Sequence, residues 1–252
     1  MTEQHALYNY CIRLGDNALV QSYRLAEWCS NAPMLEEDLA LTNMALDMTG
    51  RAQLLLQYAA TIAGKGESDD DLAYRRSEPE YLNNLICELP DKDFAFSMVR
   101  QMLTSTFEFF LYSSLTTSAD KTLAAIAAKA VKEARYHMVH TTDWVIRLGD
   151  GTDESHTRSK NALDSLWPYT AELFETNSED DELTGKGITE NMKPIKENWV
   201  KHITSSLTSA KLSVPADGYQ HTGGRKGMHT EYLGHILSEM QYLQRAYPDA
   251  TW

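Results

Sequence analysis

Residues 120–148 read DKTLAAIAAKAVKEARYHMVHTTDWVIRL, and this stretch decides the fold. Asp120 is a residue type that caps helix N-termini, and neither Gly nor Pro interrupts the sequence that follows it. Side chains three and four apart trace one seam, which runs through Leu123, Ile126, Ala130, Glu133, His137, His140 and Trp144. The stretch predicts a long helix whose buried stripe is interrupted by a carboxylate, Glu133, and an imidazole, His137.

Three more segments of similar length carry apolar residues near the helical period, at residues 6–30, 35–63 and 93–118. Strand-like alternation bounded by turns is absent from this half of the chain. Four long helices with short connections pair best as antiparallel neighbours. The sequence therefore predicts an all-α, four-helix bundle with a core at about residues 5–149.

The remaining chain predicts accessory C-terminal helices at 154–175, 194–212 and 229–246, together spanning about 154–247. No long linker separates them from the bundle, so residues 1–252 are expected to form one domain. Between the helices, the sequence predicts an acidic loop at 67–71, a short helix at 78–88, a polar loop at 177–187 and an irregular loop at 215–227.

The composition is that of a globular protein, with 42% hydrophobic residues and a formal charge of −13 from 36 acidic and 23 basic side chains. Such a field disfavours nucleic acid and anionic membranes as partners. No run is long and apolar enough to cross a bilayer, and the first residues do not resemble a signal peptide. Cys11, Cys29 and Cys87, an odd number, are expected to be buried reduced thiols, which favours a cytoplasmic location.

A bundle of long helices can hold two iron ions with one Glu on each of two helices and a Glu-x-x-His on each of the other two. The chain has carboxylates in comparable places, Asp16 or Glu27 on the first helix, Asp47 on the second and Glu108 on the third. The fourth helix offers Glu133. The two histidine positions are altered, because Gly50 follows Asp47, and Tyr136 follows Glu133 with His137 one place later.

Carboxylates that lack both properly spaced histidines are a poor ligand set for two irons. We therefore interpret seven residues as remnants of a degenerate metal site that holds no metal and performs no catalysis: Asp16, Asp47, Gly50, Glu108, Glu133, Tyr136 and His137. Buried carboxylates without a metal need other partners. Glu133 and His137 are expected to pair with one another in the old metal space.

Other motifs carry little chemistry. The loop Gly223-Gly224-Arg225-Lys226-Gly227 could contact a phosphate or a partner, although it lacks the preceding strand and the GK[ST] ending of a P-loop. His229 and His235, near Glu231, are expected to be satisfied core or interface residues rather than metal ligands.

Several long stretches carry a resemblance to a known family. They are LGDNALVQSYRLAEW (14–28), DLALTNMALDMTGRAQLLLQYAA (38–60), DDDLAYRRSEPEYLN (69–83), AAIAAKAVKEARYHMVHTTDWVIRLGDGTDESH (124–156), LWPYTAELF (166–174) and HTGGRKGMHTEYLGHILSEMQYLQRAYPDA (221–250). Together they closely resemble the C subunits of the bacterial phenylacetyl-CoA oxygenases, or epoxidases. The resemblance covers nearly the whole chain, although no single segment is a catalytic signature.

The resemblance implies a ferritin-like structural subunit, not active alone, that partners a related di-iron A subunit. That complex, with a small B subunit and a reductase, epoxidises the ring of phenylacetyl-CoA with O₂ and NADPH in phenylacetate catabolism. The cofactors implied are di-iron in the A subunit, and flavin, iron–sulfur and NADPH through the reductase, with none in this chain. By analogy with related heterodimers, an exposed aromatic or Met-rich stripe with Trp28, Met34, Met44 and Tyr58 is expected to meet the A subunit.

Two other functions remain open. In the first, Asp16, Asp47, Glu108, Glu133 and His137 bind iron or manganese, and the chain is itself an oxygenase subunit. In the second, the chain is a binding module whose loop at 223–227 contacts the phosphates of coenzyme A delivered to a neighbour.

Overall fold

The computed structural model describes residues 3–216, 218–248 and 250, and every regular element in this part of the chain is helical. The all-α prediction is confirmed. Contacts divide the chain into two compact units, Met1–Pro90 with Thr222–Trp252, and Asp91–His221. This grouping separates the accessory helices from one another, because the last falls in the first unit and the others in the second. A single domain over 1–252 stays a prediction.

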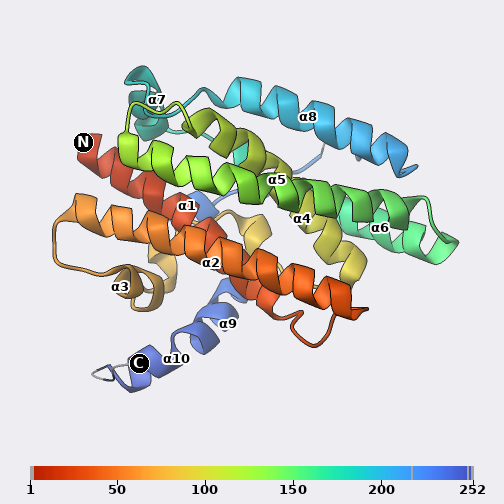
Figure 1. The fold of residues 1–252 in the computed structure, drawn as a ribbon, viewed down its shortest axis with the longest axis horizontal. Coiled ribbons are helices and arrows are strands. Elements are labelled where there is room, and N and C mark those ends of the chain that lie inside the picture. The colour runs from red at the N-terminus through yellow and green to blue at the C-terminus, as the bar shows by residue number, and fades with distance from the viewer. Residues whose placement is uncertain (1–2, 217, 249, 251–252) are drawn as a thin grey trace. The chain divides into compact units, whose positions relative to one another are not determined.

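The first unit is built on two long helices, α1 (Glu3–Ala26) and α2 (Leu35–Ala63), which pack along one another (Figure 1). They are followed by α3 (Asp69–Tyr74) and single 3₁₀ turns at Glu78–Glu80 and Leu85–Cys87. The C-terminal segment adds α9 (Glu231–Met240) and α10 (Tyr242–Ala246) to the same unit. Its core is formed by aliphatic and sulfur side chains that are almost fully buried, among them Leu25, Leu41, Met48, Leu55 and Ile86.

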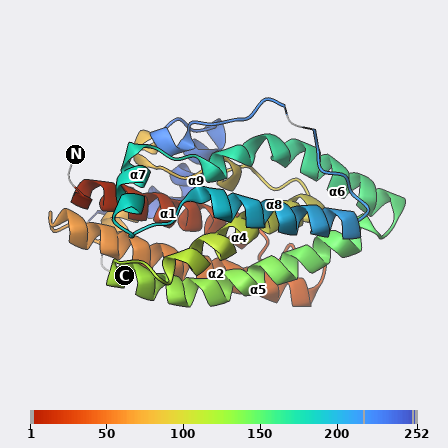
Figure 2. The same ribbon diagram turned by 90° about the horizontal axis from the view of Figure 1, so that it is seen from above.

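The second unit is built on α4 (Phe94–Leu115) and α5 (Lys121–Gly149), with α6 (Asp153–Leu166) and α8 (Met192–Ser209) packed against this pair (Figure 2). A shorter helix, α7 (Ser178–Gly185), precedes α8. The buried indole of Trp199 on α8 donates a hydrogen bond to the backbone carbonyl of Leu103 on α4, at 2.9 Å. This bond fixes how α8 lies on α4.

The bounds of the long helices follow the predictions closely, and the differences lie in short segments. The predicted helix at 154–175 is wrong beyond residue 166, where 3₁₀ turns replace it at Pro168. The short helix expected at 78–88 is two separate 3₁₀ turns. The predicted final helix is divided at Gln241 into α9 and α10.

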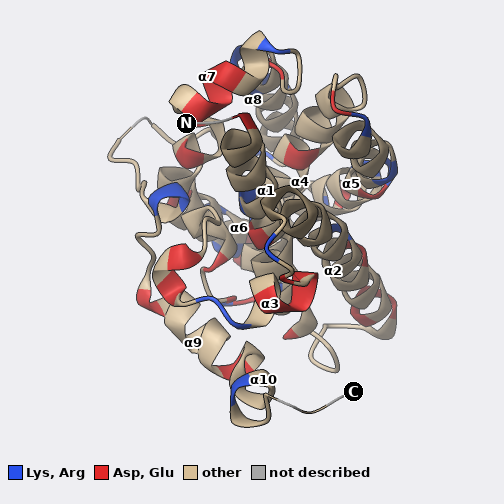
Figure 3. Cartoon of the chain, turned by 90° about the vertical axis from the view of Figure 1, so that its left-hand side faces the viewer, with Lys and Arg blue, Asp and Glu red and all other residues tan. Residues whose placement is uncertain are grey.

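The predicted acidic loop at 67–71 and the predicted polar loop at 177–187 are in fact partly helical, as α3 and α7, and Figure 3 shows the acidic residues that they carry. Ser68 and Asn177 cap these helices. The acids lie in the first turns, where the helix dipole stabilises negative charge.

Cys11 and Cys87 are buried as predicted, but Cys29 is exposed, so the prediction for that thiol is wrong; all three are free. Within the described ranges, every helix is too short or too polar to cross a membrane.

The cap of α7 provides a test of its assignment as a helix. The Asn177 side chain accepts bonds from the amides of Glu179 and Asp180, at 2.9 and 3.0 Å. Replacing Asn177 with Ala should cost this helix about 1 kcal/mol, because both amides lose their acceptor. In this variant, hydrogen exchange of residues 178–185 should speed up about fivefold. The control Asn198→Ala, which replaces an exposed residue of α8, should leave the exchange of that segment unchanged. Equal exchange in both variants would contradict the cap.

Candidate functional site

The seven predicted metal-site positions divide between the two units. Asp16 lies on α1, and Asp47 and Gly50 lie on α2, all in the first unit. Glu108 on α4 belongs to the second unit, together with Glu133, Tyr136 and His137 on α5. Each group therefore has to be judged by the partners it finds within its own unit.

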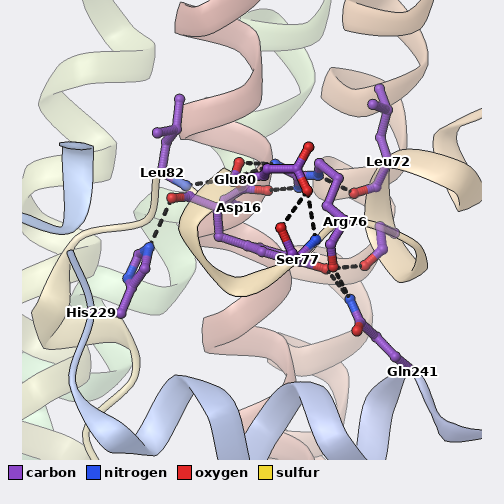
Figure 4. A network of polar contacts seen from close by, with 10 residues as sticks. Asp16, Leu72, Arg76, Ser77, Glu80, Leu82, His229 and Gln241 are labelled. Carbon is purple, nitrogen blue, oxygen red and sulfur yellow. Dashed lines mark hydrogen bonds and ion pairs between the residues drawn. The ribbon is translucent and has the colours of Figure 1, made fainter. Parts of the chain in front are cut away.

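Asp16 is fully buried, and both of its carboxylate oxygens are held by Arg76 (Figure 4). One guanidinium nitrogen of Arg76 donates to Asp16 Oδ2 at 3.0 Å, and the other makes a close contact with Oδ1. The backbone amide of Leu82 also donates to Oδ2, at 2.8 Å. A bidentate guanidinium and an amide compensate a buried carboxylate without any metal.

Arg76 is itself held on every side. It donates to the backbone carbonyls of Leu72 and Glu80, at 2.5 and 2.8 Å, and its guanidinium lies 4.2 Å from the centre of the Tyr81 ring. Its own carbonyl accepts a bond from Gln241 Nε2 at 2.9 Å, and the same amide also bonds the Tyr81 hydroxyl at 2.8 Å. The Asp16–Arg76 pair thus joins α1, the segment at 72–82 and the C-terminal helices.

These contacts do not fit a metal centre at Asp16. A ligand carboxylate must offer a free oxygen to the cation, but here a guanidinium occupies the place where a cation would bind. Asp47 is only half-buried, and Gly50 provides no side chain. Glu27, the other candidate on α1, is exposed and pairs with Arg24 at 2.5 Å. No cluster of three or more His, Cys, Asp or Glu side chains arranged for a metal occurs in the described part of the chain.

In a Glu-x-x-His motif that starts at Glu133, the residue at position 136 would face the interior. On α5 the residue that does so is the next one, His137. His137 is fully buried, whereas Tyr136 is 51% exposed and stacks on His140, with ring centres 5.6 Å apart. Tyr136 therefore does not fill a ligand place in the interior. Glu133 is 16% exposed and lies 3.8 Å from Lys129, and Glu108 is buried. A Glu133–His137 pair stays a prediction.

A second buried polar pair joins Glu88 to His229, and both side chains are fully buried. His229 Nε2 lies 2.8 Å from the Tyr81 carbonyl, and Nδ1 lies 3.4 Å from Glu88 Oε1. Because a carbonyl only accepts, Nε2 carries a proton. A second proton, held between Nδ1 and the Glu88 carboxyl group, then joins the two side chains by a hydrogen bond. His229 is thus a satisfied core residue, as the sequence predicted.

Two glycines of the loop at 223–227 serve close packing. A Cβ on Gly224 would lie 2.2 Å from the Asn83 carbonyl oxygen, and one on Gly227 would lie 2.2 Å from that of Pro79. The amides of residues 226, 227 and 228 donate to carbonyls within the loop. A phosphate cradle needs free amides, and these bonds engage the Lys226 amide within the loop. A phosphate or partner contact at Gly223, Gly224, Arg225 and Lys226 stays a prediction.

Sequence reasoning missed Arg76, Glu88 and Gln241. Arg76 lies next to Arg75 in an acidic stretch, which favours the expectation of two exposed surface charges. A usable signal was present, because a buried acid on α1 requires a buried base elsewhere in the chain. That base follows Asp16 by 60 residues, so no local pattern identifies it.

The neighbouring arginines allow a matched test of the Asp16 pair. Replacing Arg76 with Met should lower the free energy of unfolding by about 3 kcal/mol, because Asp16 remains buried without compensation. Arg75→Met should cost less than about 0.5 kcal/mol, since Arg75 is exposed and pairs with Asp71 at the surface. Adding Asp16→Asn to Arg76→Met should restore part of the loss. Equal destabilisation by the two single variants in urea titrations would contradict the role of the pair.

The Glu88–His229 pair predicts a pH dependence. Burial raises the pKa of Glu88. Burial also opposes the charged imidazole, but the bonds to Glu88 and Tyr81 outweigh it and raise the pKa of His229. Both groups therefore bind protons more tightly in the folded state than in the unfolded state. Their contribution to stability is present at low pH and is lost as pH rises through the folded-state pKa values.

We therefore expect this contribution to fall across the pH range that begins at the ordinary pKa values of the two groups, 4.5 for Glu88 and 6.5 for His229. The measurement is the free energy of urea unfolding across this range. The slope should flatten in the His229→Gln variant and persist in His235→Gln, where the exposed α9 histidine is replaced. A wild-type slope that survives His229→Gln would assign the dependence to other groups.

Comparisons with known proteins identify the family of the chain. The chain matches the family model described as phenylacetic acid catabolic protein over residues 1–252. It is also 45% identical over 243 residues to the C subunit of the 1,2-phenylacetyl-CoA epoxidase of Escherichia coli (strain K12), an alignment covering 96% of this chain and 98% of the relative. The family is ferritin-like, in agreement with the predicted fold class. The chain belongs to the phenylacetic acid catabolic protein family.

Proposed function

We propose that this chain is the structural, non-catalytic subunit of a phenylacetyl-CoA epoxidase complex. It pairs with a di-iron A subunit and supports that subunit while it epoxidises the aromatic ring of phenylacetyl-CoA with O₂ and NADPH. The observation that carries the proposal is the pairing of Asp16 with Arg76. In this pair, both oxygens of the carboxylate that would bind a metal accept hydrogen bonds from a guanidinium instead. The Escherichia coli relative, named as one subunit of an epoxidase, supports membership of such a complex.

In this proposal the redox chemistry belongs to other chains. The two irons are held by the A subunit, and electrons from NADPH reach them through a reductase with flavin and an iron–sulfur centre. The assembly also includes a small B subunit. Nucleic acid and membranes are not among the partners, and the assembly works in the cytoplasm.

A helical chain without metal can serve as a scaffold when buried charges such as those of Asp16 and Arg100 are compensated within the chain. In the first unit, Arg76 compensates Asp16. In the second, fully buried Arg100 on α4 pairs with Asp91 at 2.7 Å. Fixed ion pairs with further hydrogen bonds hold their helices in one arrangement without a metal ion. Such a chain can present a constant surface to a catalytic partner.

The alternative, an oxygenase subunit that uses Asp16, Asp47, Glu108, Glu133 and His137, faces a specific energetic obstacle. Asp16 would have to leave Arg76, and the guanidinium would then remain buried without its counter-charge. Breaking a buried pair in this way costs about 3–5 kcal/mol. Metal binding would have to supply that energy in addition to its own requirements.

The proposal is tested by omission and by one isosteric variant. The A subunit, B subunit and reductase should oxidise NADPH with phenylacetyl-CoA at least about tenfold more slowly without this chain than with it. Glu133→Gln in this chain should leave the rate within about twofold, as should the control Glu197→Gln on the exposed surface of α8.

Two results would contradict the proposal. One is full activity in the absence of this chain. The other is loss of turnover on Glu133→Gln with the complex still assembled, which would place a carboxylate of this chain in the chemistry.

A further inference from the structure

The outward face of α2 exposes large apolar side chains. Leu35, Leu39 and Leu46 are 71%, 56% and 64% exposed, and Met34, just before the helix, is 45% exposed. The three leucines lie four and seven residues apart, so they form one stripe along the helix. Contiguous exposed apolar patches on a protein surface mark sites of protein interaction.

This leucine stripe differs from the contact expected from the sequence. Of the four predicted contact residues, Met44 is fully buried, so that prediction is wrong. Trp28 and Tyr58 are half-buried, and Met34 is exposed. The exposed apolar residues of α2 are thus leucines in its first half rather than methionines and aromatics.

A groove of about 340 Å³ lies beside the stripe, between α1 and α2, and Leu46 forms part of its wall. Its other walls include Leu19, Ala26 and Met240. Tyr23, also in the wall, donates a hydrogen bond to the Glu239 carboxylate of α9. Burial first and this carboxylate second raise the pKa of Tyr23 to about 12.

The charged side chains of α2 that reach the surface have one sign. Within α2 the acidic residues that reach the surface are Glu36, which is exposed, and Asp38 and Asp47, which are half-buried, whereas Glu37 is buried. The only basic residue of this helix is Arg51, which is 1% exposed. The surface that α2 presents is therefore an apolar ridge with acidic flanks. Complementarity requires a partner with an apolar ridge and basic flanks.

We propose that the leucine stripe and its groove are a docking surface for a helix of the catalytic A subunit that carries an apolar ridge flanked by Lys or Arg. The inference rests on the proposed function, because it assigns the surface by which the structural subunit meets its partner. A helix is the matching occupant, since side chains on one helical face interdigitate with a groove between two others. The exposed leucines supply the apolar centre, and the acids supply the rim.

The first test removes the apolar centre. In Leu39→Ser with Leu46→Ser, the Kd for the A subunit should rise at least about 30-fold, because central apolar contacts dominate interface affinity. The matched control, Val139→Ser with Val200→Ser, removes side chains that are 48% and 45% exposed in the second unit and should change the Kd less than about threefold. Both variants should keep the thermal midpoint of the free wild-type chain, because every substituted residue is exposed.

The second test changes the charge of the flank. Glu36→Lys with Asn43→Lys replaces two exposed residues of α2, and the Kd should rise at least about tenfold at low salt. The difference from wild type should shrink as salt is added, because salt screens rim charges.

The outcomes separate this inference from the proposed function. The docking surface is supported if both α2 variants bind the A subunit more weakly than the wild-type chain does while the control variant binds it as tightly. The docking surface is overturned if the leucine variant binds the A subunit with the wild-type Kd, or if the charge variant does so at low salt. The scaffold function would still stand in either case. Failure of the wild-type chain to bind the A subunit would overturn both.

Discussion

The ion pair between Asp16 and Arg76 is the interaction on which the first unit depends. A carboxylate on a fully buried helix position costs several kcal/mol unless a charge compensates it. Arg76 supplies that charge from a segment outside the long helices, and its own carbonyl then binds Gln241 from the C-terminal segment. One buried charge thus determines where three distant parts of the sequence lie. The same pairing removes Asp16 as a metal ligand.

The long helices could be predicted from the sequence because they are decided locally. The apolar period from Leu123 to Val145 and the cap at Asp120 determine α5 without reference to other segments. Shorter elements such as α7 depended on recognising Asn177 as a cap rather than as part of a polar loop. The partners of buried charges could not be predicted, because Asp16 with Arg76 and Glu88 with His229 are joined across 60 and 141 residues. Only the folded chain brings such residues together.

Exposure was predicted least well. The helical period tells which residues share a face, but it does not tell which of two apolar faces is covered. Met44 and Leu46 both suit a helix interior by type, yet one is fully buried and the other is 64% exposed. Tyr136 and His137 are adjacent, yet they show the same contrast.

These features together describe a helical chain in which Arg76 compensates the buried carboxylate of Asp16 and in which α2 exposes leucine side chains. A scaffold of this kind has no working metal centre, so the amount of metal that the chain binds is the most direct test of its role. The full-length chain, purified alone and offered Fe(II) under anaerobic conditions, should retain well below one iron per chain after gel filtration. Two irons per chain that survive gel filtration would contradict the scaffold role, because Asp16 would then have exchanged Arg76 for a metal.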